Sequence, residues 1–120
     1  MADRRQTDPE RFIPLTPAVF EILLALANGE RHGYAIMRDV GERTGGRITL
    51  RPGTLYRAIS RLLEDGLIVE SAERPAPDED DERRRYYGLT ALGRRVAAAE
   101  AVRMSELVRS AHARALIDRV

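Results

Sequence analysis

Residues 52–89 constrain the fold most, because an amphipathic helix pattern there runs directly into two strand patterns. Five apolar side chains recur at the spacing of one helix face: Leu55, Ala58, Ile59, Leu62 and Leu63. Asp65-Gly66 ends this pattern, and residues 67–74 and 83–89 then have the composition of two strands. The segment 75–82 between them contains two prolines and five consecutive acids, which regular structure does not accommodate. The region therefore predicts a helix followed by a β-hairpin with a long tip.

Two shorter helices are predicted before this region. Thr16-Pro17 is a typical helix start, because threonine caps a helix and proline fits the first helical position. A second helix is predicted from Gly33 to Thr44, with a buried stripe of Tyr34, Met37 and Val40. Residues 47–50 alternate polar and apolar, which predicts a very short strand.

One long helix is predicted from Thr90 to about Asp118. A stripe along it steps by four and three residues, which is a heptad-type repeat: Ala97, Ala101, Met104, Val108, Ala111 and Ala115. The stripe could be core within one chain. A single helix after a hairpin has little left to pack on, however, and alanines permit close approach of a second helix. We therefore expect the stripe to form a homodimer.

The order of these elements predicts a fold that is mainly α with a small β-hairpin (α+β). Three helices followed by a hairpin are typical of a winged helix-turn-helix, here extended by a long C-terminal helix. The expected organisation is a flexible N-terminal arm at 1–14, a winged-helix DNA-binding domain at 15–89 and a dimerisation helix at 90–120.

Composition excludes several classes of function. The 120 residues suit one domain, and the absence of cysteine excludes disulfides, thiolate zinc sites and thiol catalysis. His32 and His112 have no ligand-like spacing, no nucleophile motif surrounds a serine, and no phosphate-binding loop is present. We expect no catalytic residue, no metal, no cofactor and no enzyme. No transmembrane run or signal peptide is evident, so we expect no membrane partner and a cytoplasmic protein.

The face of the 52–64 helix opposite its apolar stripe is the candidate reading surface. Arg57 and Arg61 can reach base edges or phosphates, and Ser60 can hydrogen-bond either. Thr54 and the first amides of the helix can hold a phosphate. The Tyr56 hydroxyl either contacts the DNA backbone or packs within the protein, and the sequence leaves both open. The full set of predicted DNA-binding residues is Thr54, Tyr56, Arg57, Ser60, Arg61, Arg83, Arg84 and Arg85.

Four motifs in this order and spacing resemble the PadR family of bacterial transcriptional regulators. They are His32-Gly33-Tyr34-Ala35-Ile36, then Gly53-Thr54-Leu55-Tyr56, then Arg61-Leu62 with Gly66-Leu67-Ile68, and last Tyr86-Tyr87-Gly88-Leu89-Thr90-Ala91-Leu92-Gly93-Arg94. The resemblance implies a homodimeric winged-helix DNA-binding protein, usually a repressor. One long helix after the wing resembles the compact subgroup, in which that helix makes the dimer.

The chain departs from the family pattern in two places. The wing tip, Asp78-Glu79-Asp80-Asp81-Glu82, is acidic and would be repelled by phosphates, which puts deep insertion of the tip in doubt. The run is either a solvated disordered loop or a device that lowers DNA affinity or binds another protein. Second, the chain has no tryptophan, so the flat ligands that drug-binding relatives stack on that residue do not carry over.

The sequence predicts a sequence-specific DNA-binding transcriptional regulator that acts as a homodimeric, ligand-responsive repressor. Its expected partners are a double-stranded DNA operator of roughly palindromic sequence, a second copy of itself and a small-molecule inducer, whose existence and identity the sequence leaves open. The alternative is a winged helix that contacts only proteins, which the acidic wing favours.

Overall fold

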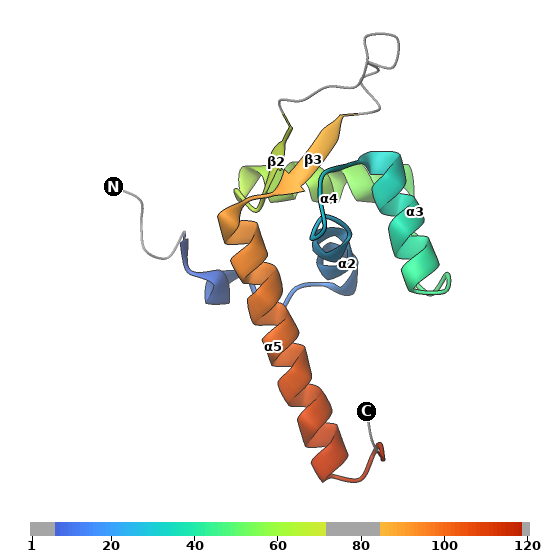
Figure 1. The fold of residues 1–120 in the computed structure, drawn as a ribbon, viewed down its shortest axis with the longest axis vertical. Helices are drawn as coiled ribbons and strands as arrows, with labels where there is room; N and C mark the ends of the chain where they lie inside the picture. Colours follow the sequence, from blue (N-terminus) through green and yellow to red (C-terminus); the bar gives the residue numbers. More distant parts are fainter. Residues whose placement is uncertain (1–6, 72–84, 119–120) are drawn as a thin grey trace.

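The computed structural model describes residues 7–71 and 85–118. In chain order the elements are η1 (Pro9–Phe12), α2 (Pro17–Ala25), β1 (Arg31–His32), α3 (Gly33–Arg43), α4 (Pro52–Glu64), β2 (Ile68–Glu70), β3 (Tyr86–Leu89) and α5 (Ala91–Ala113). Figure 1 shows α2, α3 and α4 gathered with the strands into a body from which α5 extends. This architecture confirms the predicted fold class, a mainly helical chain with a small antiparallel sheet and a long last helix.

Two predicted helix caps are present. Thr16 precedes α2, and its side chain accepts a hydrogen bond from the Val19 N–H at 3.2 Å, with Pro17 at the first helical position. Thr90 precedes α5 and accepts from the Gly93 N–H at 2.9 Å. Each cap satisfies one of the N–H groups that a helix start leaves without an internal partner.

The core lies between the three helices of the body, the sheet and the first turns of α5. Its largest fully buried side chains are Ile22, Leu23, Leu26, Ile36, Val40, Leu55, Ile59, Leu67, Glu100 and Val96. The buried positions of α4 are Leu55, Ile59 and Leu62, as its apolar spacing predicted. The opposite face of α4 is therefore turned outward.

The predicted inner face of α3 is partly wrong. Ile36 and Val40 are fully buried, but Tyr34 is 62% exposed. Gly33, Ile36 and Val40 form the buried side of the helix, so Tyr34 falls outside it. The tyrosine ring instead stacks on His32, with 6.4 Å between the ring centroids.

The predicted strand at residues 47–50 is also wrong. The sheet has the order β1-β3-β2, and its third strand is Arg31–His32. Residues 47–50 are held near the end of α3 instead: the Thr44 hydroxyl accepts from the Ile48 N–H at 3.1 Å and donates to the Val40 carbonyl at 2.8 Å. This local turn chemistry competes with strand pairing.

The wing strands pair antiparallel, in the register Ile68 with Leu89, Val69 with Gly88 and Glu70 with Tyr87. On the other edge of β3, Arg31 pairs with Tyr87 and His32 with Tyr86. The sheet thus joins the start of α3 to the wing. The acidic run at 78–82, together with Arg83 and Arg84, lies outside the described residues.

Part of the N-terminal segment, for which a flexible arm was predicted at 1–14, packs against the last helix. Residues 9–12 form the 3-10 helix η1, which packs against α5. Asp8 caps this helix by accepting from the Glu10 N–H at 3.0 Å. The segment is then fastened by the Leu15 N–H, which donates to a carboxylate oxygen of Glu100 at 2.6 Å.

Glu100 is the buried ionised group of this junction, with only 1% of its surface exposed. Its other carboxylate oxygen accepts a short hydrogen bond from the Arg103 Nε. That bond lowers the pKa of Glu100 below its ordinary value; burial opposes the effect, and the Leu15 N–H and the charge of Arg103 add to it. The carboxylate therefore stabilises the fold while it is ionised.

We expect Glu100→Gln to remove an acid-sensitive part of the stability. Because the folded pKa of Glu100 is lowered, its contribution is complete above the pKa of an unfolded glutamate, about 4.3, and is lost as the pH falls through the lower folded pKa. At pH 7 the variant should lose about 1–3 kcal/mol of unfolding free energy, and this deficit should shrink in acid. Urea unfolding across pH checks this, with the exposed Glu106→Gln as control. A deficit that is constant with pH would contradict the assignment.

The predicted last helix ends earlier than residue 118. A left-handed residue, Ala115 with φ 62°, follows α5. The Leu116 N–H bonds to the Ala111 carbonyl at 2.9 Å and the Ala115 N–H to the His112 carbonyl at 3.0 Å. These two bonds close the helix as a Schellman motif. Ala115 therefore lies after the helix rather than on its stripe.

Among residues 7–71 and 85–118, the structure contains no helix that is both long and apolar enough to cross a membrane.

Candidate nucleic-acid interface

The outward face of α4 carries four of the eight predicted DNA-binding residues. The side chains on this face that are exposed are Thr54, Arg57, Ser60 and Arg61. Figure 1 shows α4, the β2–β3 strands and the start of α3 at the end of the molecule opposite the C-terminal end of α5. The four side chains thus share one accessible surface with the base of the wing.

The first turn of α4 lacks the side-chain cap that α2, α3 and α5 possess. Arg51 occupies the N-cap position without a side-chain hydrogen bond, and Pro52 follows at the first helical position. The N–H groups of Gly53 and Thr54 are among those that a helix start leaves without an internal partner. The Arg57 guanidinium lies near this turn, since a Cβ at Gly53 would be 4.0 Å from its Nη1. Amides and a guanidinium that converge in this way can bind a phosphate oxygen.

Tyr56 is half-buried and packs between α4 and the start of α3. Its hydroxyl lies over Gly33, so closely that a Cβ at that position would overlap it. Gly33 therefore provides the space for the ring, which connects the first and second motifs of the sequence. Of the two alternatives for Tyr56, the structure supplies the packing contact, and a DNA contact through its hydroxyl stays a prediction.

Several exposed arginines at this end of the molecule lie near an acid. The three ion pairs are Arg38 with Glu42 at 3.5 Å, Arg61 with Asp65 at 3.5 Å, and Arg85 with Glu70 at 3.6 Å. Arg57 has no ion pair with any acid in the described parts of the chain. Arg57 is thus the arginine of the α4 face whose charge is least offset by a close carboxylate.

The start of α3 adds the exposed ring of Tyr34, which the sequence analysis had predicted to be buried. His32 caps this helix, its Nδ1 accepting from the Ala35 N–H at 3.1 Å. The His32 ring also meets Tyr86 edge-on, with 5.5 Å between the ring centroids. His32 and Tyr34 line an open hollow of about 420 Å³ together with Arg38. The sequence signal for the outward position of Tyr34 was the spacing of Ile36 and Val40. These two apolar residues are four apart and form a buried helix face that leaves Tyr34 outside it.

Arg43 fixes α3 against α2. Its Nη1 is 2.7 Å from a Glu21 carboxylate oxygen, and its Nε donates to Asp39 at 2.8 Å. Its Nη2 also donates to the Glu21 backbone carbonyl at 3.1 Å. Because Tyr56 packs on the start of α3, this clamp also sets where α4 lies in the body.

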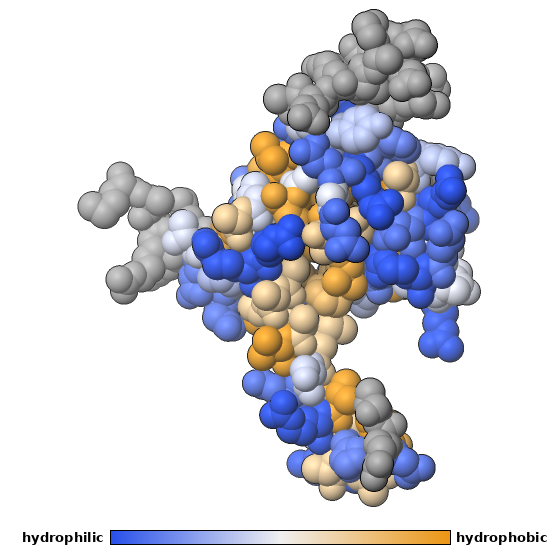
Figure 2. All heavy atoms as spheres, viewed as in Figure 1, coloured by the Kyte–Doolittle hydropathy of each residue, from blue (hydrophilic) through white to orange (hydrophobic). Residues whose placement is uncertain are grey.

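The outer half of α5 forms the second candidate surface. The buried residues of this helix, Gly93, Val96 and Glu100, all lie in its first half. Beyond them, Met104 and Val108 are 41% and 43% exposed. Figure 2 shows apolar side chains along α5 where it leaves the body. Of the predicted stripe, Ala97 packs partly against the core, Ala101, Met104 and Val108 are exposed, and Ala111 is half-buried.

A three-helix body with an exposed third helix, followed by an antiparallel hairpin, defines a winged helix-turn-helix. The model of the transcriptional regulator PadR-like family matches residues 22–99, which is more than half of the chain. The chain belongs to this family, which is one of transcriptional regulators and not of enzymes.

Two protein relatives match over most of this chain. An uncharacterized 37.1 kDa protein in transposon TN4556 of Streptomyces fradiae is 38% identical over 86 residues, which are 72% of this chain and 22% of that protein. The chain thus spans under a quarter of that relative. Uncharacterized protein X of Lysinibacillus sphaericus is 30% identical over 98 residues, 81% of each chain.

Solved structures share the fold. A transcriptional regulator from Clostridium thermocellum aligns with a TM-score of 0.63 at 26% identity, over 81% of this chain and 87% of that one. Bacillus subtilis PadR, solved in complex with operator DNA, aligns with a TM-score of 0.58 at 22% identity, over 68% of this chain and 44% of that one.

Proposed function

We propose that the protein is a sequence-specific regulator that binds double-stranded DNA through α4 and the base of the wing. The single observation that carries the proposal is the outward face of α4, where Arg57, Ser60 and Arg61 lie exposed beside an uncapped first turn. A helix face of this kind fits the major groove, where arginine can bind guanine edges. Membership of the PadR-like family and the operator complex of Bacillus subtilis PadR support it.

We further propose that the working form is a homodimer. Residues 90–120 would form the dimerisation unit and residues 15–89 the DNA-binding domain. In a symmetric dimer, two α4 helices would enter successive major grooves about one helical turn apart, which requires a roughly palindromic operator. Repression follows if such an operator overlaps a promoter. An inducer would act by changing the angle between the two heads, which α5 links. The cytoplasm is the expected compartment for these interactions.

A winged helix that binds only proteins remains the second candidate, and the acidic run at 78–82 is what favours it. Selection of bound fragments from the source genome tests both. A DNA-binding regulator should enrich a common palindromic sequence, and its affinity for that duplex should fall steeply with salt as phosphate contacts release counterions. Failure to enrich any sequence, with no retention of duplex at low salt, would favour the protein-binding candidate.

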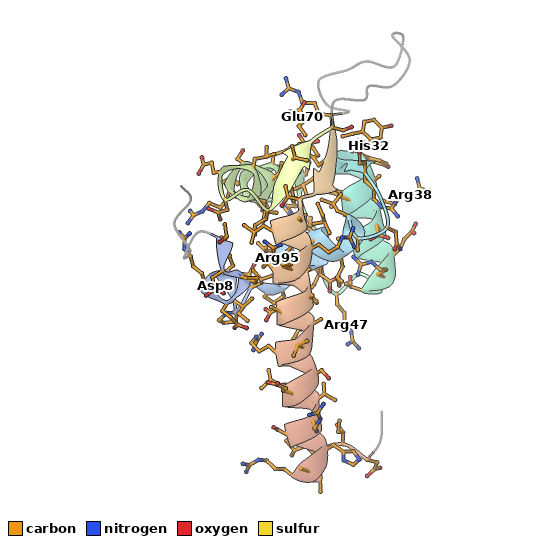
Figure 3. The ribbon with its side chains drawn as sticks, turned by 60° about the vertical axis from the view of Figure 1, so that its left-hand side comes forward. Asp8, His32, Arg38, Arg47, Glu70 and Arg95 are labelled. Carbon is orange, nitrogen blue, oxygen red and sulfur yellow. The ribbon has the colours of Figure 1, made fainter. Side chains whose placement is uncertain are left out.

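We expect Arg57→Ala to weaken operator binding by about 1–3 kcal/mol without unfolding the protein. If Arg57 binds guanine, the loss should be confined to the operator and relax one position in each half-site. If it binds phosphate, all duplexes should weaken alike and the salt slope should shrink by about one per contact. The matched control is Arg95→Ala on α5, an exposed arginine that Figure 3 shows away from the wing end of the molecule. Equal operator affinity for both variants and the parent would rule out a role for Arg57.

A further inference from the structure

Acids accompany the arginines of the candidate DNA surface on three different elements. Glu42 lies near Arg38 on α3, and Asp65 lies near Arg61 at the end of α4. The third pair joins Glu70 of β2 to Arg85 at the start of β3, 3.6 Å apart. The two pairs outside α4 lie on or beside elements that contact this helix, because α4 contacts both α3 and β2. Figure 3 shows Glu70 beside the wing strands and Arg38 on the outer side of α3.

These pairs do little for the stability of the fold. Their arginine side chains are exposed or half exposed, and their N–O distances of 3.5 Å, 3.5 Å and 3.6 Å are long for a hydrogen-bonded pair. Exposed pairs of this kind contribute little because water and salt screen them. By contrast, Arg43 pairs with Glu21 at 2.7 Å and connects two helices. The position of the three acids therefore needs a reason other than folding.

Their charge matters most when a polyanion approaches. Each arginine that neutralises a phosphate releases condensed counterions, and this gain is the main source of affinity for DNA of any sequence. A carboxylate that stays beside the arginine offsets its charge and is itself repelled by the phosphates within about 10 Å. The full chain has 20 basic and 19 acidic residues, a net charge of +1, so it has no general excess of positive charge to overcome such local repulsion.

We propose that Glu42, Asp65 and Glu70 lower the sequence-independent affinity of this surface for duplex DNA. Arg57, which has no such partner among the described residues, is left to contact DNA at full charge. The acids thereby determine specificity, because a weak general affinity lets base contacts decide where the protein stays. This inference rests on the proposed DNA-binding function.

The test compares two triple variants with the same net charge. The first is Glu42→Gln with Asp65→Asn and Glu70→Gln. The control is Glu10→Gln with Glu106→Gln and Asp118→Asn, three exposed acids on η1, on α5 and after it. Both raise the formal net charge by three units. Binding to a mixed-sequence 30-base-pair duplex is measured between about 50 and 200 mM salt, and circular dichroism confirms that each variant is folded.

The first variant should bind the mixed duplex more tightly than the control. If all three freed arginines of a protomer reach phosphates, its log–log salt slope should steepen by about 2.7 for each protomer bound, so that the fourfold salt reduction strengthens binding roughly 40-fold more per protomer than for the parent. Asp65→Asn alone should give about one third of the change in slope. This single variant replaces the triple variant in the test if the triple variant does not fold.

Equal slopes for the two triple variants would overturn the inference, because net charge alone would then explain the effect. An unchanged slope for the first variant would overturn it as well. Failure of the parent and of both variants to bind any duplex at the lowest salt would overturn the proposed function together with the inference. A parent that binds duplex, with slopes that do not differ, would overturn the inference alone.

Discussion

Val108→Glu should convert the protein to a monomer and abolish operator binding at the same time. Val108 lies in the middle of the exposed stripe of α5 and is 43% exposed in the single chain. In the proposed dimer it would face its symmetry mate, so the substitution would bury two unpaired carboxylates. The cost of about 3–5 kcal/mol would raise the dimer dissociation constant by roughly two to four orders of magnitude. Sedimentation at micromolar concentration and operator binding measure the two effects.

The matched control for this prediction is Ser110→Glu. Ser110 is exposed on the same helix, and at about 100° per residue it points away from the stripe. It should remain dimeric and bind operator as the parent does. The Val108→Glu monomer should keep its fold, because that side chain is not part of the core of one chain. A Val108→Glu protein that stays dimeric would remove the stripe from the interface, and the intrachain alternative for these residues would gain support.

Gly93→Ala should destabilise the fold by about 3 kcal/mol or more, an unusually large effect for one methyl group. Gly93 is buried in the first turn of α5, and a Cβ there would overlap the backbone carbonyl oxygen of Leu67. That carbonyl is fixed by the N–H of Thr90, which donates to it at 3.1 Å. Because both sides of the contact are backbone, no side chain can move to make room.

Gly41→Ala is the control for this effect, because nothing lies within 4 Å of the Cβ it would add to α3. It should stabilise the protein by up to about 1 kcal/mol, since alanine is the better helix former. Urea unfolding of both variants measures the difference through the midpoint, with the slope unchanged. Equal midpoints would show that α5 and the start of β2 can separate at little cost, so the wing would not be fixed to the long helix.

Local patterns in the sequence were enough to predict the helices and the outward face of α4. The spacing of Leu55, Ile59 and Leu62 correctly identified the buried side of α4, and thereby the side that carries Arg57. Thr16 and Thr90 cap the helices that they were expected to cap. These features depend on groups three or four residues apart, so the chain needs no distant partner to specify them.

The same local reasoning misplaced features that depend on competition for a partner. Residues 47–50 have a strand-like pattern, yet the free edge of β3 is taken by Arg31–His32 and the loop is held by Thr44. Tyr34 fits an apolar stripe, yet Ile36 fills the core in its place. In the first case two segments compete for one strand edge, and in the second two side chains compete for one place in the core. Only packing decides which of them occupies it.

The sequence by itself determined the element order and the family resemblance. It also determined two surfaces, the outward face of α4 and the stripe of α5. Each of these features depends on short motifs or on residues that are close together along the chain. The tertiary structure decided how those surfaces are held. It joins Leu15 to Glu100 across 85 residues, packs Tyr56 on Gly33, and places Glu70 beside Arg85. Such contacts follow from the meeting of distant segments in the folded chain, and no periodicity or spacing along the sequence encodes them.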